Sequence, residues 1–306
     1  MLTTAQLRQI AGQTRRDITN IEIEVILTFL LQLFHDRRFS EHLAFKGGTM
    51  LRKMIFGQSG RLSTDLDFTR TSTATDEEIV GLLIDLFHEP YLGLSFALDD
   101  KDIYITDTSC AANPICYHDG NKNGVKIKVQ ISLREAPLLP VVPVPQKEQT
   151  YFKLLLFKPA DFPCLSFPEA ISEKIRAATQ RAKIRDLYDL HEISKTTFDR
   201  DLVRSLAVLK LWQSQGDELS YQQFKRQIED GKQYDVNDLT NLLTKGQKVE
   251  LRQMIVDVVN RYDFLDRMTE DEARLAADKY CRMSAEYAAF RDQVVAAGIR
   301  LPLIDL

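Results

Sequence analysis

The sequence contains little that would support disulfide or zinc chemistry. It includes only four cysteines, and none of them forms a Cys-x-x-Cys pair or stands beside a cluster of histidines. The five histidines show no metal-ligand spacing among themselves. Structural zinc and disulfides are therefore not expected, and reduced cysteines are typical of a cytoplasmic protein.

Clean membrane spans and an excess of charge of one sign are also lacking. The N-terminus has no apolar signal-peptide core, and the most apolar early stretch, 18–34, carries Glu22 and Glu24. This stretch predicts a buried helix rather than a membrane span, so no membrane partner is expected. The formal net charge is only −4. Any basic surface for nucleic acid must therefore be local.

What the sequence does contain is enough apolar material for two domains of ordinary size. Its 306 residues are 44% hydrophobic and 27% charged, the balance of a soluble globular protein. Strand and helix patterns mix in the first half, whereas helical patterns dominate after a proline-punctuated stretch. The predicted class is α+β, with an α/β domain over 1–165 and a mainly helical domain over 166–306.

Several elements can be predicted from their patterns alone. Helices are expected over 4–12 and from residue 17 or 19 to 35, the second so apolar that it must be largely buried. Alternating apolar and polar residues predict one strand over 125–134 and a weaker one over 95–104. Residues 166–169, Ser-Phe-Pro-Glu, have the form of a capping box at the start of a helix.

A pair of aspartates is the first sign of chemistry. Asp65 and Asp67 lie in an alternating stretch that predicts a strand, so both carboxylates should project to one side. Two such carboxylates can share a divalent metal ion, the usual device for neutralising phosphate charge in nucleotidyl transfer. A lone Asp-x-Asp is more often a solvated strand edge.

A glycine pair precedes the aspartates. Gly47 and Gly48 would let the backbone come close to a triphosphate, and Thr49, at the start of a following helix, would offer its hydroxyl and free amides to the phosphate oxygens. A lone Gly-Gly is more often a simple turn. The two blocks together, in one contiguous stretch, are much rarer than either alone and favour a nucleotide site.

A third block is basic. On one continuous helix, Lys174, Arg181 and Arg185 would lie near one face, which would suit a bound nucleoside triphosphate. Asp186 and Asp189 could orient these cations or contact the nucleotide. The alternative is an ordinary charged surface helix whose side chains are solvated.

These blocks resemble the AbiEii-type nucleotidyltransferase toxin family, which includes MenT-like toxins of type IV-like toxin–antitoxin systems. The resemblance spans residues 46–189 and implies a polymerase-β-like fold, with a small mixed sheet and flanking helices, followed by a mainly helical domain. The residues that match the family's two N-terminal blocks are Lys46, Gly47, Gly48, Thr49, Arg61, Ser63, Asp65 and Asp67.

The resemblance also implies a role for each block. Asp65 and Asp67 would hold Mg²⁺ (or Mn²⁺), the catalytic lysine maps onto Lys174, and the later catalytic aspartate maps onto Asp186 or, as the alternative, Asp189. The nucleotide-binding set would be Lys46, Gly47, Gly48, Thr49, Arg61, Ser63, Arg181, Arg185 and Asp189.

One departure concerns the strand over 125–134. Polymerase-β-like enzymes usually present a third carboxylate there, and the corresponding residue here is Gln130, provided that the strand is aligned correctly. Glutamine cannot act as a general base and is a weak metal ligand. A single essential metal, with Lys174 supplying positive charge, is therefore the more economical mechanism.

The expected activity is transfer of a nucleoside monophosphate from a nucleoside triphosphate to RNA. By resemblance the acceptor is the 3′ end of tRNA, so that translation stops, and a cognate antitoxin is the expected protein partner. The alternatives are a small-molecule or protein hydroxyl as acceptor, or a degenerate nucleotidyltransferase that serves as a binding module. Candidate RNA-facing residues are Lys122, Lys126, Lys128, Arg134 and those over 181–185.

Overall fold

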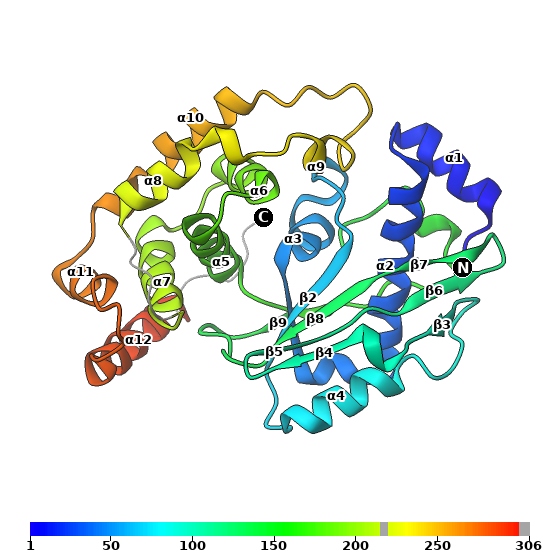
Figure 1. The fold of residues 1–306 in the computed structure, drawn as a ribbon, viewed down its shortest axis with the longest axis horizontal. Helices are drawn as coiled ribbons and strands as arrows, with labels where there is room; N and C mark the ends of the chain where they lie inside the picture. Colours follow the sequence, from blue (N-terminus) through cyan, green and yellow to red (C-terminus); the bar gives the residue numbers. More distant parts are fainter. Residues whose placement is uncertain (215–219, 300–306) are drawn as a thin grey trace. The chain divides into compact units, whose positions relative to one another are not determined.

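The computed structural model describes residues 1–214 and 220–299 and divides the chain into two compact units (Figure 1). Unit 1 comprises Met1–Pro137, Val141–Cys164 and Thr240–Gln247. Unit 2 comprises Leu138–Pro140, Leu165–Leu239 and the chain from Lys248 onward. The main division thus falls after Cys164, and one segment between two helices of unit 2 belongs to unit 1.

Unit 1 is built on a mixed seven-stranded sheet in the order β4-β5-β8-β2-β1-β10-β9, with a second sheet in the order β3-β6-β7. Strand pairs β2–β8 and β1–β10 are parallel, and the other pairs of the large sheet are antiparallel. The predicted α+β class with a mixed sheet is therefore confirmed. The elements of unit 1 are α1 (Thr4–Thr14), α2 (Ile18–Asp36), β1 (Leu43–Lys46), α3 (Gly47–Met50), β2 (Asp65–Arg70), α4 (Asp76–Asp85), β3 (Ser95–Ala97), β4 (Ile103–Thr106), β5 (Ser109–Ala112), β6 (Ile115–His118), β7 (Asn121–Lys126), β8 (Lys128–Ser132), β9 (Val142–Val144) and β10 (Phe162–Cys164).

Helix α2 forms the centre of the unit 1 core. It begins after Asp17, whose carboxylate accepts hydrogen bonds from the amides of Thr19 and Asn20, as a good N-cap should. It is long and apolar enough to cross a membrane by length and composition, but 78% of its most apolar window is buried within the protein. The predicted buried helix is confirmed.

The cluster of aromatic rings between α2 and the sheet fixes which way the central strand faces. Phe34 of α2 packs against Phe68 of β2 at 5.7 Å between ring centroids, and Phe68 also contacts Phe45 and Phe162 at 5.2 and 5.7 Å. Because strand side chains alternate, burying Phe68 turns its odd-numbered neighbours to the other face.

The predicted strand over 125–134 is wrong as a single element. The chain forms β7 and β8, which end and begin on either side of Ile127 and belong to different sheets. The amide of Ile127 donates to the carbonyl of Pro114 at 3.0 Å, outside both strands. The predicted burial pattern nevertheless holds, since Ile127, Val129 and Ile131 are fully buried. The weaker strand over 95–104 is also divided, into β3 and β4 of different sheets.

Unit 2 is helical throughout its described residues, apart from its connecting loops. Its first helix begins where the sequence predicts, but the capping box is wrong, because the carboxylate of Glu169 accepts the amides of Leu138 and Leu139 at 2.8 and 2.9 Å and pairs with Lys210 at 2.7 Å. The α-helices of this part of the chain are α5 (Phe167–Gln180), α6 (Ile184–Ser194), α7 (Arg200–Trp212), α8 (Tyr221–Glu229), α9 (Asn237–Thr240), α10 (Leu251–Arg261), α11 (Glu270–Ala276) and α12 (Ser284–Gly298).

Candidate active site

The aspartate pair lies on β2, the middle strand of the seven-stranded sheet. Leu66 and Phe68 are fully buried, whereas Asp65 and Asp67 are half-buried on the opposite face. The predicted strand and the shared side of the two carboxylates are therefore confirmed. A central strand anchored by aromatic packing is a rigid support for a pair of charged ligands.

Gly47 lies directly against Asp67. Lys46, the last residue of β1, is paired with Asp67 across the antiparallel ladder, and α3 begins at the next residue. Gly47 has a φ of +80°, and a β-carbon on it would stand 2.5 Å from Oδ2 of Asp67. Only glycine combines this left-handed backbone with so close an approach of the carboxylate.

The side chain of Arg61 lies against Gly48, the next residue of the same turn. A β-carbon on Gly48 would overlap the guanidinium group of Arg61, which is 5% exposed and donates to the carbonyl of Leu62 at 3.1 Å. The structure thus brings together Gly47, Gly48, Arg61 and Asp67 within unit 1. The glycines form the first turn of α3, whose amides lack intrahelical partners.

The hydroxyl groups of Thr49 and Thr64 both bond to Asp65 and hold the start of β2 in place. Thr49 is fully buried, and its hydroxyl donates to the backbone carbonyl of Asp65, so this hydroxyl joins α3 to β2. Its amide, in the first turn of α3, is the part that could meet a phosphate. The hydroxyl of Thr64 donates to Oδ1 of Asp65, and Ser63 is 5% exposed in the segment that leads into β2.

Strand β8 places an amide beside the carboxylates. In the parallel register of β2 and β8, Asp67 is paired with Gln130 and Asp65 with Lys128. Gln130 therefore lies beside Asp67, and its match to the third carboxylate of the family stays a prediction. Within the described residues no group of three or more His, Cys, Asp or Glu side chains could hold a metal ion.

The donor set nonetheless fits a hard divalent cation. Mg²⁺ is commonly held by one or two carboxylates together with substrate phosphates and water, rather than by a closed protein cage. Asp65 and Asp67 supply the two carboxylates, and the Gln130 amide lies beside Asp67 on the neighbouring strand. Mg²⁺ or Mn²⁺ with a bound triphosphate matches this arrangement.

In unit 2, Lys174 is surrounded by carboxylates. Its ammonium nitrogen lies 3.1 Å from Oδ1 of Asp186 and 2.7 Å from Oδ2 of Asp189, and the lysine is 8% exposed. Nε of Arg181 donates to Oδ2 of Asp186 at 3.0 Å. We call these four residues the Lys174 cluster. Arg185 is half-exposed on the same helix as the two aspartates.

The continuous helix predicted for this region is wrong, and the break is what creates the cluster. Helix α5 ends at Gln180, Arg181 is extended with a φ of −150°, and α6 begins at Ile184. On an unbroken helix Asp186 would lie about 18 Å along the axis from Lys174, beyond the reach of an ion pair. The turn therefore folds α6 back so that its carboxylates meet Lys174.

The charges in the Lys174 cluster act strongly on Asp186. Burial alone would raise the pKa of this carboxyl, but the positive charges of Lys174 and Arg181 outweigh it and lower the pKa to about 2. Asp186 is therefore ionised at physiological pH. The ionised carboxylate pairs with the ammonium group of Lys174 and orients it.

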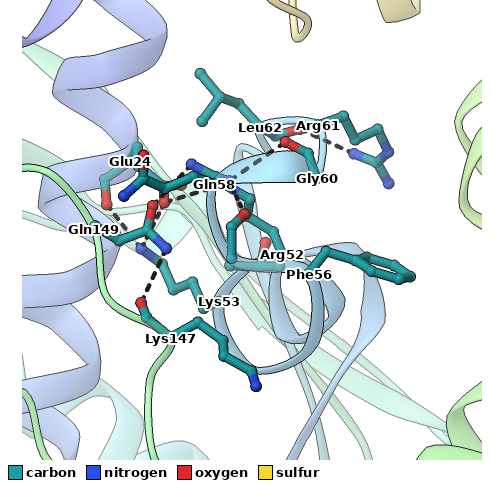
Figure 2. A network of polar contacts seen from close by, with 12 residues as sticks. Glu24, Arg52, Lys53, Phe56, Gln58, Gly60, Arg61, Leu62, Lys147 and Gln149 are labelled. Atoms are coloured by element: carbon teal, nitrogen blue, oxygen red, sulfur yellow. Dashed lines mark hydrogen bonds and ion pairs between the residues drawn. The ribbon is translucent and has the colours of Figure 1, made fainter. Parts of the chain in front are cut away.

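A second buried ionic network was not predicted from the sequence (Figure 2). Glu24 of α2 is fully buried, with Lys53 at 3.3 Å and Arg52 at 3.5 Å from its Oε1. Lys53 also donates to the hydroxyl groups of Thr28 and Tyr151 at 2.8 and 3.3 Å. Burial lowers the pKa of Lys53, while the pKa of Glu24 is lowered because its two cations outweigh the effect of burial.

We call this set of residues the Glu24 network. It anchors the helical segment that follows the glycines of the candidate site. Arg52 and Lys53 lie in a π-helical turn, Leu51–Phe56, that continues directly from α3 and its glycines. The network therefore fixes the far end of the helical segment that begins at Gly47. Charged residues at 24, 52 and 53 within apolar stretches were the signal in the sequence.

Comparison with known proteins agrees with this geometry. The sequence profile of the family "Nucleotidyl transferase AbiEii toxin, Type IV TA system" matches residues 28–297. Among solved structures, MenT4, a nucleotidyltransferase toxin of Mycobacterium tuberculosis, is similar with a TM-score of 0.80 and 25% identity, covering 97% of this chain and 99% of that one. JHP933 of Helicobacter pylori shares the fold with a TM-score of 0.51 and 19% identity, covering 85% and 97% of the two chains. No curated protein matches the sequence significantly.

Proposed function

Because the chain belongs to the AbiEii family of nucleotidyltransferase toxins, we propose that it transfers a nucleoside monophosphate from a nucleoside triphosphate to RNA. The observation that supports this most directly is Asp67 on β2, held against Gly47 with Asp65 on the same face. That arrangement joins a pair of metal-binding carboxylates to a helix start whose amides can receive phosphate oxygens.

Asp65 and Asp67 would hold Mg²⁺ or Mn²⁺, which when bound neutralises charge on the triphosphate. The amides of Gly47, Gly48 and Thr49 and the guanidinium of Arg61 would orient the phosphates. The acceptor hydroxyl oxygen forms a bond to the α-phosphorus as the bond to pyrophosphate breaks. The hydroxyl proton passes to a water molecule, and the Gln130 amide takes no part in this transfer because it is not a base.

The Lys174 cluster is proposed to act in the same reaction. Lys174 would stabilise the negative charge that develops as pyrophosphate leaves, and Asp186 and Asp189 would orient it. Arg181, Arg185 and Lys46 would add positive charge toward the triphosphate. These roles rest on the motif match and on the ion pairs within the cluster.

The acceptor that we propose is the 3′ end of tRNA, whose modification would block translation in the cytoplasm. The toxin family implies a cognate antitoxin as partner. In cells, production of the chain alone should arrest growth. The variant Asp65→Asn/Asp67→Asn should not arrest growth, because it removes both charges while keeping the shape of the side chains.

Label transfer tests the proposal. Each α-labelled nucleoside triphosphate is incubated with the protein and Mg²⁺, with and without total tRNA, and the products are separated into RNA, protein and small molecules. Asp107→Asn, at an exposed turn residue of the same unit, is the matched control. We expect label on tRNA with the wild type and with Asp107→Asn, and none with Asp65→Asn/Asp67→Asn.

The other outcomes identify the alternatives. Label found only on protein or on a small molecule would change the acceptor and keep the chemistry. No label under any condition would favour a degenerate nucleotidyltransferase that acts as a binding module. The position of Gln130 beside Asp67 would then be the structural reason.

A further inference from the structure

A basic hollow lies in unit 1 at the connection between α1 and α2. It has a volume of about 510 Å³, and four of its lining residues are the cations Arg8, Arg15, Arg16 and Lys245. Among residues 1–214 and 220–299, no acidic residue lines it. In a chain with a net charge of −4, this is a local concentration of positive charge.

Two hydrogen bonds between Arg15 and Lys245 hold the hollow in shape. The amide of Lys245 donates to the carbonyl of Arg15 at 2.7 Å, and a guanidinium nitrogen of Arg15 donates back to the carbonyl of Lys245 at 3.2 Å. These bonds place Lys245, which is 230 residues away in sequence, beside the end of α1. Such long-range pairing brings the cations together before any ligand binds.

The same segment is tied to the candidate active site. The carbonyl of Leu242 accepts from a guanidinium nitrogen of Arg16 at 2.8 Å and from the amide of Leu62 at 2.9 Å. Arg16 also donates to the carbonyls of Gln58 and Gly60 at 3.2 and 3.0 Å. The wall of the hollow is thus bonded to the chain that leads into Asp65.

One of the four cations has a structural role, and the other three are exposed and can contact a ligand. Arg16 is buried and donates to three carbonyls, so it holds the wall. Arg8, Arg15 and Lys245 are exposed. Asp17, at the start of α2, already accepts two backbone amides as an N-cap. The hollow therefore offers cationic donors to an anionic ligand.

We propose that this hollow binds phosphate groups along the backbone of the RNA acceptor. Contacts to phosphates position a nucleic acid without reading its sequence, and lysine and arginine are the side chains that make them. The inference rests on the proposed function in naming RNA as the ligand. It adds a docking surface on Arg8, Arg15 and Lys245, which belong to neither β7 nor β8.

Gly12 gives a direct test. It lies in α1 and lines the hollow, and a β-carbon on it would meet no atom within 4 Å. Gly12→Glu would put a carboxylate into the hollow without a clash, and Gly12→Gln is the neutral control of the same shape. Both replacements favour the helix over glycine, so both proteins should fold.

The probe is a fluorescein-labelled 20-nucleotide single-stranded RNA, with total tRNA as unlabelled competitor. By fluorescence anisotropy at low salt, we expect Gly12→Glu to bind about tenfold more weakly than Gly12→Gln. Arg8→Gln/Lys245→Gln should also bind more weakly. Its slope of log K against log salt concentration should fall by about 0.7 for each lost contact.

Matched controls separate the hollow from general charge. Lys153→Gln/Lys158→Gln removes two exposed lysines of the same unit and should leave binding unchanged. A parallel titration with ATP should give the same affinity for all variants. Weaker ATP binding in Gly12→Glu would make the hollow a nucleotide site and overturn the RNA assignment.

The proposal is overturned if Gly12→Glu and Arg8→Gln/Lys245→Gln bind RNA as their controls do. Because binding is measured without catalysis, this result is independent of label transfer. A protein that binds RNA through the hollow but transfers no nucleotide would overturn the proposed function and support this inference. If the wild-type protein transfers nucleotide to RNA but these variants bind RNA with unaltered affinity, the proposed function is supported and this inference is overturned.

Discussion

Replacing Gly47 by alanine should damage the candidate site both through a steric clash and through backbone strain. The added β-carbon would stand 2.5 Å from Oδ2 of Asp67, and ordinary contact begins at 3.4 Å, so the carboxylate must move by about 0.9 Å. The left-handed backbone of Gly47 adds a conformational cost of about 1–3 kcal/mol for a residue with a side chain.

Both effects can be measured separately. A shift of this size at a metal ligand should lower the rate of label transfer by up to about 10²-fold and raise the Mg²⁺ concentration for half-maximal rate. Urea unfolding should show the loss of stability. Gly81→Ala is the matched control, because a β-carbon at Gly81 in α4 meets no atom within 4 Å. It should gain about 1 kcal/mol from helix propensity and keep full activity.

The reasoning would be refuted by a Gly47→Ala protein with the wild-type rate and Mg²⁺ dependence. Such a result would mean that the Asp67 carboxylate can move without consequence and is not a ligand in the reaction. Loss of stability with unaltered kinetics would assign the glycine to folding alone.

Three further changes probe the rest of the account. The pKa of Asp186 is about 2, below its ordinary 3.8, so its ionised form stabilises the fold above pH 4 and this contribution is lost as the pH falls toward 2. Asp186→Asn should therefore lower the free energy of unfolding by about 2 kcal/mol at pH 7. In urea titrations, the difference in stability between this variant and the wild type should shrink between pH 4 and pH 2. A difference that stays constant over this range would contradict the reasoning. Lys53→Met should cost about 3–5 kcal/mol because it leaves Glu24 buried with one cation fewer, and Glu24→Gln/Lys53→Met should recover part of that loss in the same assay; equal stability of the two variants would argue against a net electrostatic penalty. Gln130→Ala should keep the label-transfer rate within about threefold, since the amide supplies neither charge nor a base, and a loss as large as that of an Asp67 variant would make Gln130 a metal ligand.

The central strand could be predicted from local sequence because its signal is local. Leu66 and Phe68 alternate with Asp65 and Asp67, and burial of the apolar pair decides the face of the carboxylates. The same holds for α2, whose apolar density predicted a buried helix, and the Asp17 cap seen in the structure fixes its start.

Elements that depend on distant partners were predicted less well. The alternation over 125–134 gives the burial of Ile127 and Val129 correctly, but it carries no information on which strand each half pairs with. Glu169 has the spacing of a capping box, yet Lys210 and two amides from another segment take its carboxylate. Tertiary partners outweighed the local pattern in both cases.

In the candidate site, too, local patterns were predicted correctly and contacts with distant partners were not. The motif predicted that Gly47 contacts a nucleotide, and the structure adds the close approach of Gly47 to Asp67. Lys174 and Asp186 were expected on one continuous helix, but they meet through a turn that no glycine or proline marks. The Glu24 network joins residues 29 apart, and nothing local pairs them.

The most direct test of the central claim compares intact tRNA with tRNA whose 3′-terminal ribose has been oxidised by periodate. Wild-type protein, Asp65→Asn/Asp67→Asn and Asp107→Asn are each given the preferred α-labelled triphosphate and Mg²⁺. We predict label on intact tRNA only, with the wild type and Asp107→Asn alone. Label that persists in the doubly substituted protein would contradict the role of the two carboxylates, and label on oxidised tRNA would contradict transfer to the 3′ end.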